Sequence, residues 1–304
     1  MANQNIVSID PVSLSEVERK ELVEKKATCP FIGTAVMAKE LSVRNDANNP
    51  LASIKEVVTL GNLGNGDLGR VLEIFAKGNH AFMLGNSGKL DRPVPDGQFS
   101  LNFPDSKGSH PGHSGILQGR PDLLDSGRFS SEDFKRLTDK ATNGLITLSS
   151  VGEFIAENTV MDSKSNLADL DLLPLILEEV TEIILQGGQI FLEKVNFFGT
   201  RKAKDLSPEE NKLRDKVCKV TGGKNNLVSS AGEFGLLFAF FANKPGTLKG
   251  SEPTLSVEDL TLMFEHKQFP AGWKTWKKDA STWVTSTVHL ASSAVKKFES
   301  LKNS

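Results

Sequence analysis

Helix-start signals recur along this chain of 304 residues, and no strand signal of comparable length accompanies them. In each of these signals a serine precedes an acidic residue three positions on, a pattern that caps the free backbone N–H groups of a helix. Examples begin at Ser15, Ser130, Ser207 and Ser256. The best alternating apolar and polar segment, 99–103, is short for a strand-based domain. The sequence therefore predicts an all-α, mainly helical fold.

Apolar residues at helical spacing predict about ten helices in a single domain. They are expected over residues 15–26, 29–41, 53–60, 67–77, 130–140, 150–155, 170–186, 207–218, 229–241, 256–264 and 280–301. Residues 1–24 are interpreted as an N-terminal extension and residues 25–304 as the domain. Residues 78–128 are rich in Gly, Pro, Ser, Asp and His, so we expect a long irregular loop region there. A loop of such length is usually functional or disordered.

Charge and cysteine content exclude several classes of partner. The 36 basic and 38 acidic side chains leave a net charge of −2, which gives no reason to expect nucleic acid or an anionic membrane surface. Two cysteines, Cys29 and Cys218, make neither a disulfide framework nor a multi-cysteine zinc site. No apolar run is long enough to span a membrane, and residues 1–11 contain no apolar signal core. We therefore expect a cytoplasmic or otherwise intracellular protein without a membrane span.

Cys29 stands directly before Pro30 and an apolar run at helical spacing over 31–41. Proline is favoured in the first helical position, so Cys29 or the preceding Thr28 is expected to cap a helix. Free backbone N–H groups and the positive end of the helix dipole meet at such a position, and both favour a thiolate. A thiolate there is a nucleophile or a soft metal ligand. The competing interpretation is a small packed side chain, as free cysteine often is.

Two further features carry side chains suited to chemistry. His110 and His113 lie in the Gly- and Pro-containing segment 109–115, where they can bind a metal, move protons or face solvent. Glu233 is a single carboxylate in an otherwise apolar helix. Burial favours the protonated form of such a group, which suits general acid–base catalysis near neutral pH. The position of Glu233 near a helix start, where a carboxylate is favoured anyway, offers a purely structural explanation.

Other catalytic motifs are absent from the sequence. There is no phosphate-binding loop and no Gly-x-Ser-x-Gly elbow. The glycines of 61–66 follow an expected helix and stand in the wrong order for a dinucleotide fingerprint. No tyrosine occurs in the chain, so none can act catalytically.

The order of these features resembles the haem-thiolate peroxidase family, which includes the fungal chloroperoxidases and the unspecific peroxygenases. In that family a Pro-Cys-Pro opens a helix, and here Thr28-Cys29-Pro30 lacks the first proline. A later family loop carries Glu-(His or Gly)-Asp-x-Ser, and the corresponding segment 109–115 has histidines in place of the acidic residues. A Gly-Glu at the start of an apolar helix follows in the family and matches Gly232-Glu233. The resemblance covers roughly residues 25–290 in order.

The resemblance implies a haem b protein in which the Cys29 thiolate is the axial ligand of the iron, with Pro30 beside it. Apolar side chains of the helix that carries the Gly-Glu, Phe234 and Phe238 among them, would line the cofactor pocket. The family also holds a magnesium or manganese ion beside the haem propionate. The acidic residues of that cation site are missing from 109–115, so the site lacks its family ligands here.

The resemblance also implies the catalytic groups. Glu233 would be the distal acid–base residue, which moves a proton between the two oxygens of peroxide. A histidine would orient Glu233, with His113 as the first candidate and His110 as the second. The peroxygenase branch has an arginine seven residues before the glutamate, and Asn226 stands there in this chain. That departure favours a histidine partner.

The expected function is thus a peroxidase or peroxygenase that uses hydrogen peroxide to oxidise or oxygenate a small apolar organic substrate. Two alternatives stay open. The first is a haem-free helical protein that binds a lipid or terpenoid, with Cys29 merely packed. The second is a haem-thiolate protein with other chemistry, such as an isomerase or dehydratase.

Overall fold

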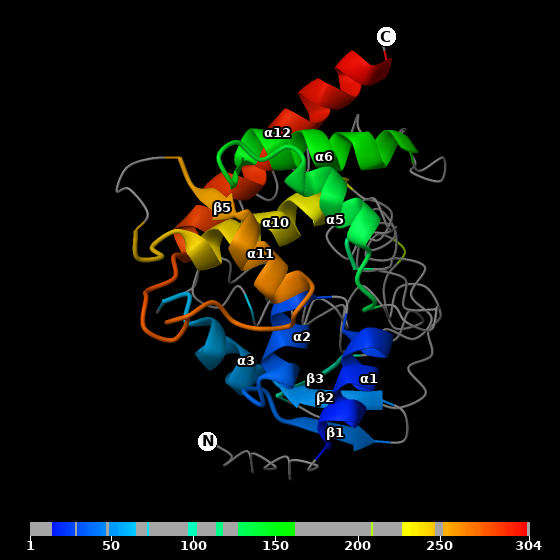
Figure 1. The fold of residues 1–304 in the computed structure, drawn as a ribbon, viewed down its shortest axis with the longest axis vertical. Helices are drawn as coiled ribbons and strands as arrows, with labels where there is room; N and C mark the ends of the chain where they lie inside the picture. The colour runs from blue at the N-terminus through cyan, green and yellow to red at the C-terminus, as the bar shows by residue number, and fades with distance from the viewer. Residues whose placement is uncertain are drawn as a thin grey trace.

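Helices make up most of the chain that the structure describes (Figure 1). The structure, a computed structural model, describes residues 14–27, 29–46, 49–64, 72, 97–101, 114–117, 127–161, 208, 227–246 and 252–302. Within these residues there are eight helices: α1 (Glu16–Lys26), α2 (Pro30–Met37), α3 (Ile54–Gly61), α5 (Ser131–Thr138), α6 (Leu148–Met161), α10 (Leu227–Phe241), α11 (Val257–Phe264) and α12 (Ala280–Lys302). The mainly helical class predicted from the sequence is confirmed.

Each described helix corresponds to one that the sequence predicts. The helices expected over 67–77, 170–186 and 207–218 fall outside the described residues, apart from single positions. About ten helices were expected for the whole chain, whereas the described residues contain eight. Of the expected loop region 78–128, the structure describes only short pieces.

Helix starts follow the serine signals closely. At α1, Ser15 N donates to Glu18 Oε2 at 2.7 Å, and Glu18 N donates to Ser15 Oγ at 3.3 Å, which completes the expected capping box. Ser130 caps α5 in the same way, because its Oγ accepts from Asp133 N at 3.3 Å. The start of α6 was predicted wrongly, since the helix begins before Ser150.

Two small antiparallel sheets accompany the helices. The first contains β1 (Val43–Asp46), β2 (Asn49–Ser53) and β3 (Gln98–Ser100) in that order, and the second pairs β4 (Leu145–Thr147) with β5 (Thr254–Ser256). β3 overlaps the alternating segment 99–103, and the other strands were not expected. β4 and β5 each lead directly into a helix. Ser150 N donates to Thr147 Oγ1 at 3.2 Å, so the last residue of β4 caps α6, which explains its earlier start.

The end of α2 also differs from the expectation, because the helix stops at Met37 rather than at Leu41. Lys39 has a positive φ of 60°, and the N–H groups of Glu40 and Leu41 both donate to Ala35 O. The chain therefore turns back on the helix end, as in other helix terminations with a left-handed residue. Leu41 is only 3% exposed. It continues the apolar run because it folds back into the core, not because it is helical.

α10 lies in the core of the protein. It contacts both α6 and α12, which cross each other in Figure 1, and its residues 233–241 are all buried. The helices approach closely at two glycines. A Cβ on Gly235 would lie 2.2 Å from Thr287 Oγ1, and one on Gly152 would lie 2.6 Å from Ser293 Cβ. The prediction that this apolar helix belongs in the core is confirmed.

The N-terminal elements form the opposite end of the molecule. Figure 1 shows α1, α2, α3 and the three-stranded sheet below α11, with α6 and α12 above it. α2 contacts α11, and Thr34 Oγ1 donates to Met263 O at 3.2 Å in the buried interface. This contact brings the start of α2 towards the core that contains α10.

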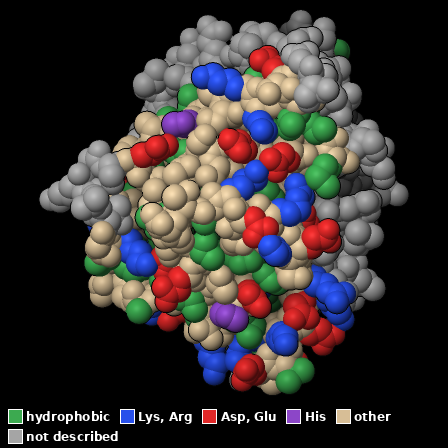
Figure 2. Space-filling model, turned by 45° about the horizontal axis from the view of Figure 1, so that its top comes forward, with side chains coloured by type: hydrophobic (Ala, Val, Ile, Leu, Met, Phe, Trp, Pro, Cys, Tyr) green, Lys and Arg blue, Asp and Glu red, His purple; other side chains and the backbone are tan. Residues whose placement is uncertain are grey.

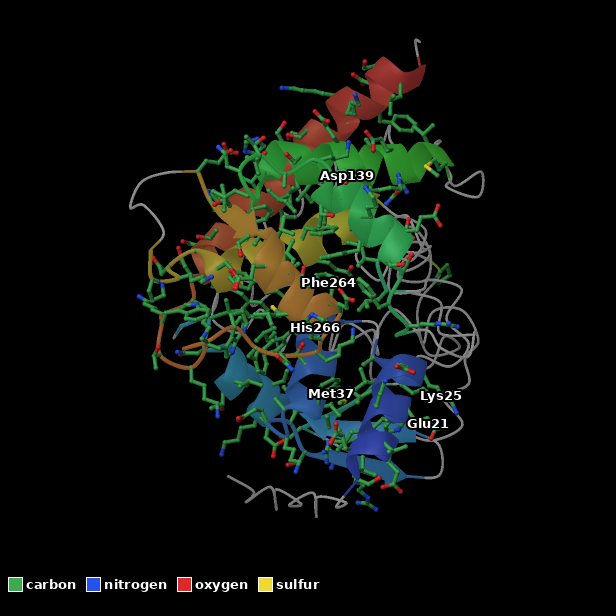
Figure 3. The ribbon with its side chains drawn as sticks, viewed as in Figure 1. Glu21, Lys25, Met37, Asp139, Phe264 and His266 are labelled. Atoms are coloured by element: carbon green, nitrogen blue, oxygen red, sulfur yellow. The ribbon has the colours of Figure 1, made fainter. Side chains whose placement is uncertain are left out.

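The described surface carries both signs of charge. Figure 2 shows basic and acidic side chains interspersed over the face in view. Several form pairs along a helix, such as Lys25 Nζ with Glu21 Oε1 at 2.5 Å, whose side chains are labelled on α1 in Figure 3. Among the described helices, none is both long enough and apolar enough to cross a lipid bilayer.

Candidate functional site

Cys29 is the N-cap residue of α2, and Pro30 occupies the first turn, as the sequence predicts. The backbone of Cys29 is extended, with φ −93° and ψ 123°, so the chain enters the helix directly after the sulfur-bearing residue. Gly33 fixes the helix against its neighbours, because a Cβ there would lie 3.0 Å from Val23 Cγ1 of α1 and 3.7 Å from Lys267 Cδ. The Cys29 side chain packs against the hydrophobic core and forms no disulfide. Its position is thus set by close packing on both sides.

Burial dominates the electrostatics of Cys29. Removal of the thiol from water raises its pKa to about 12, and the negative charge of Glu233 adds to the rise. The backbone N–H groups of Ile32 and Phe31 and the ammonium group of Lys267 lower the pKa, but by less. The helix start favours the thiolate, as the sequence predicts, but burial outweighs this effect and favours the packed thiol.

Glu233 is buried in α10 at 4% exposure and interacts electrostatically with Cys29. Positions 230, 233, 237 and 240 of α10 recur at helical spacing and share one face of the helix. On this face Phe240 lies against Phe31 of α2, with ring centroids 4.7 Å apart. The same face therefore turns both Phe240 and Glu233 towards the start of α2. The structure brings together the cysteine and the carboxylate that the sequence singled out.

Lys267 is a third charged group at this place, and sequence reasoning missed it. It follows α11, has a positive φ of 54°, and donates from Nζ to Phe264 O at 2.8 Å. Figure 3 labels Phe264, the last residue of α11, and His266, the residue before Lys267, and α2 lies below them with Met37 at its far end. Burial lowers the pKa of Lys267 to about 8, while the charges of Cys29 and Glu24 act in the opposite direction. No local motif marks this lysine, because only tertiary packing brings it to the sulfur.

Aromatic rings surround the start of α2. Phe31 lies 5.9 Å from both Phe269 and Trp273, measured between ring centroids, in addition to its contact with Phe240. Phe269 and Trp273 stack on each other at 4.8 Å. These rings give the neighbourhood of Cys29 a low-polarity wall, which strengthens the charge interactions inside it.

The aromatic residues named from the sequence lie on a neighbouring face of α10. Phe234 is fully buried and packs edge-to-face against Phe154 of α6, with ring centroids 6.2 Å apart. Phe238, one turn further along α10, is also fully buried. Phe31 and Phe240 were not predicted to be site residues, although both belong to apolar runs in the sequence.

His110 and His113 lie outside the described residues, but the chain directly after them is described. Ser114 is 1% exposed, and its Oγ donates to Ser230 Oγ at 2.9 Å. Ser230 lies one turn before Glu233 on α10. The end of the histidine segment therefore meets the helix that carries the buried carboxylate.

The donor set limits which metal groups this site suits. Among the described residues, no three His, Cys, Asp or Glu side chains gather closely enough to hold a metal ion. The site offers one half-buried sulfur, one buried carboxyl and one half-buried amine, and aromatic rings pack around the neighbouring Phe31. Such a set can hold a single axial bond to a cation and can store a proton close to it.

The fold and the site define a mainly helical protein with a half-buried cysteine, a buried glutamate and a half-buried lysine at the junction of α2, α10 and α11. Comparisons with protein-family models, with curated proteins and with solved structures found no match for the chain.

Proposed function

We propose that this protein binds haem through the Cys29 thiolate and uses hydrogen peroxide to oxidise or oxygenate a small apolar substrate. One observation carries the proposal. The half-buried Cys29 at the start of α2 and the buried Glu233 of α10 interact electrostatically. A sulfur on one side and a proton-holding group on the other are the two protein groups that haem-thiolate peroxide chemistry needs.

The donor set fits haem better than a bare metal ion. A zinc or calcium site needs several protein ligands, and the described residues offer no such group. Haem iron already has four nitrogen ligands from its ring and needs a single axial ligand from the protein. The positive charge of ferric iron also supplies what the Cys29 thiol lacks, since its pKa of about 12 leaves it protonated without a cation.

The chain's own residues have separate tasks in this proposal. Cys29 Sγ holds the cofactor, and haem with a thiolate ligand supplies an electron-rich iron that favours O–O cleavage. A Glu233 carboxylate oxygen accepts the proton of the nearer peroxide oxygen and returns it to the departing oxygen. Phe31 and Phe240, which are both fully buried, exclude water from the start of α2.

A packed, haem-free thiol is the second candidate, and it has an observation in its favour. The pKa of Cys29, raised to about 12 by burial, is that of an inert thiol when no metal is bound. In this case the apolar interior would serve a lipid-like ligand.

A haem titration separates the two candidates. Purified protein mixed with ferric haem should develop a Soret band that saturates at one haem per chain and should then consume peroxide with an aromatic substrate. The chain has two cysteines, so Cys218→Ser is a matched control for Cys29→Ala. We expect the control to keep the band and Cys29→Ala to lose it. No saturable haem binding by the wild-type protein would reject the proposal.

A further inference from the structure

Three buried polar residues form a connected cluster beside α10. Ser114, Asn158 and Ser230 are at most 3% exposed. Ser114 Oγ donates to Ser230 Oγ of α10 at 2.9 Å, and Asn158 Nδ2 of α6 donates to Ser114 O at 2.9 Å. We call Ser114, Asn158 and Ser230 the polar clasp. Buried hydrogen bonds of this kind fix the groups that they join, because leaving one partner unpaired in the core is costly.

The turn that contributes Ser114 is itself held tightly. Ser114 and Gly115 both have positive φ angles, 56° and 92°. A serine keeps this unfavourable conformation only where its surroundings determine it. Ile116 O accepts from Ser130 N at 2.7 Å, and Leu117 pairs with Phe129. The clasp therefore connects α10 to a rigid point and not to a free loop.

The clasp acts on the helical turn that carries Glu233. Ser230 and Glu233 are three residues apart on α10 and share one of its faces. On the other side, Ser114 directly follows His113 in the sequence. No residue of the clasp has a charged group, and none is needed for the peroxide step proposed above. Its physical effect is to fix the direction in which α10 presents its carboxylate.

We propose that Ser114, Asn158 and Ser230 are positioning residues for Glu233. The hydrogen bond from Ser114 to Ser230, supported by Asn158, holds the first turns of α10 so that the Glu233 carboxyl faces Cys29. This inference rests on the proposed function for its effect on turnover, although the geometry of the clasp does not. Because a displacement of about 1 Å can cost about 100-fold in rate, a missing clasp bond should reduce turnover by about tenfold or more.

The test compares matched serine variants of the full-length protein loaded with haem. Ser230→Ala removes a clasp hydroxyl, and Ser286→Ala removes a hydroxyl of α12 that is 1% exposed and has no hydrogen-bond partner. We expect Ser230→Ala to lower kcat for peroxide at least tenfold, with the Soret band and the KM of the organic substrate unchanged. Ser286→Ala should keep wild-type kcat. Ser230→Thr, which restores a hydroxyl, should recover most of the loss.

A second readout uses the haem-free protein. The side-chain carboxyl ¹³C resonance of Glu233, assigned by its loss in Glu233→Gln, should move in Ser230→Ala and Asn158→Ala but not in Ser286→Ala. If the wild type binds no haem, the proposed function fails and this resonance alone decides the role of the clasp. An unmoved resonance in the haem-free Ser230→Ala protein overturns the inference. An undiminished kcat of the haem-loaded Ser230→Ala protein also overturns it, even where the resonance of the haem-free protein moves.

Discussion

Replacing Glu233 by glutamine tests whether a buried carboxyl moves the proton in peroxide cleavage. Glutamine has nearly the same shape and hydrogen-bonding groups, but it cannot take up and return a proton at neutral pH. A positioned acid–base group contributes about 10²- to 10⁴-fold to a rate. At about 1.36 kcal/mol per factor of ten, the barrier should rise by about 2.7 to 5.4 kcal/mol.

The structure sets where in this range the loss should fall. Glu233 is 4% exposed, so bulk water cannot take over the proton transfer in the variant. We therefore expect the upper half of the range, a loss of about 10³-fold or more in kcat. Haem binding should persist or improve, because the charge of Glu233 raises the pKa of the Cys29 thiol and its removal favours the thiolate.

The assay measures haem affinity and peroxide turnover on the same preparation. Glu258→Gln is the matched control, since Glu258 is an exposed carboxylate in the first turn of α11. It should leave both quantities unchanged. Undiminished turnover in Glu233→Gln would refute the acid–base role. A loss of turnover that merely follows a loss of haem would show that Glu233 supports the fold or the cofactor instead.

Three further changes test the packing and the caps. Gly235→Ala places a methyl group 2.2 Å from Thr287 Oγ1, so it should lower the free energy of unfolding by about 1 to 3 kcal/mol, seen as a lower Tm in calorimetry. Ser130→Ala removes the cap of α5 and should cost about 1 kcal/mol in urea unfolding, whereas the exposed neighbour Ser131→Ala should cost little. Burial lowers the pKa of Lys278 to about 8, so the folded protein releases this proton before the unfolded chain does. Lys278 should therefore add stability between about pH 8 and about pH 10.4, so the change in the free energy of urea unfolding across this interval should be less favourable in Lys278→Met than in the wild type.

Local signals in the sequence predicted where most described helices begin. A serine cap joins groups only three residues apart, so the sequence contains the whole interaction at Ser15 or Ser130. The end of α2 was not predictable in this way. Ala38, Lys39 and Glu40 are all good helix formers, yet the chain turns at Lys39 because Leu41 gains burial in the core. Tertiary packing overrides local preference there.

The site was partly predictable, because some of its residues stand out from their neighbours in the sequence. Cys29 and Glu233 each stand out locally, one before a proline and one as the lone charge of an apolar helix. Lys267 and Phe240 do not stand out in the sequence. They reach the site through contacts between distant parts of the chain, such as the hydrogen bond of Thr34 with Met263, 229 residues apart. The ionisation of Cys29 was not predictable, because the sequence shows the helix start, which lowers the pKa, but not the burial that outweighs it.

The identity of the axial ligand tests the central claim most directly. Haem-loaded wild-type protein, reduced and exposed to carbon monoxide, should show the long-wavelength Soret band of thiolate ligation. Cys29→His offers an imidazole at the same position and should shift that band to the shorter wavelength of a histidine-ligated haem. A wild-type spectrum already of the histidine type, or a Cys29→His spectrum unchanged from the wild type, would contradict the assignment of Cys29 as the ligand.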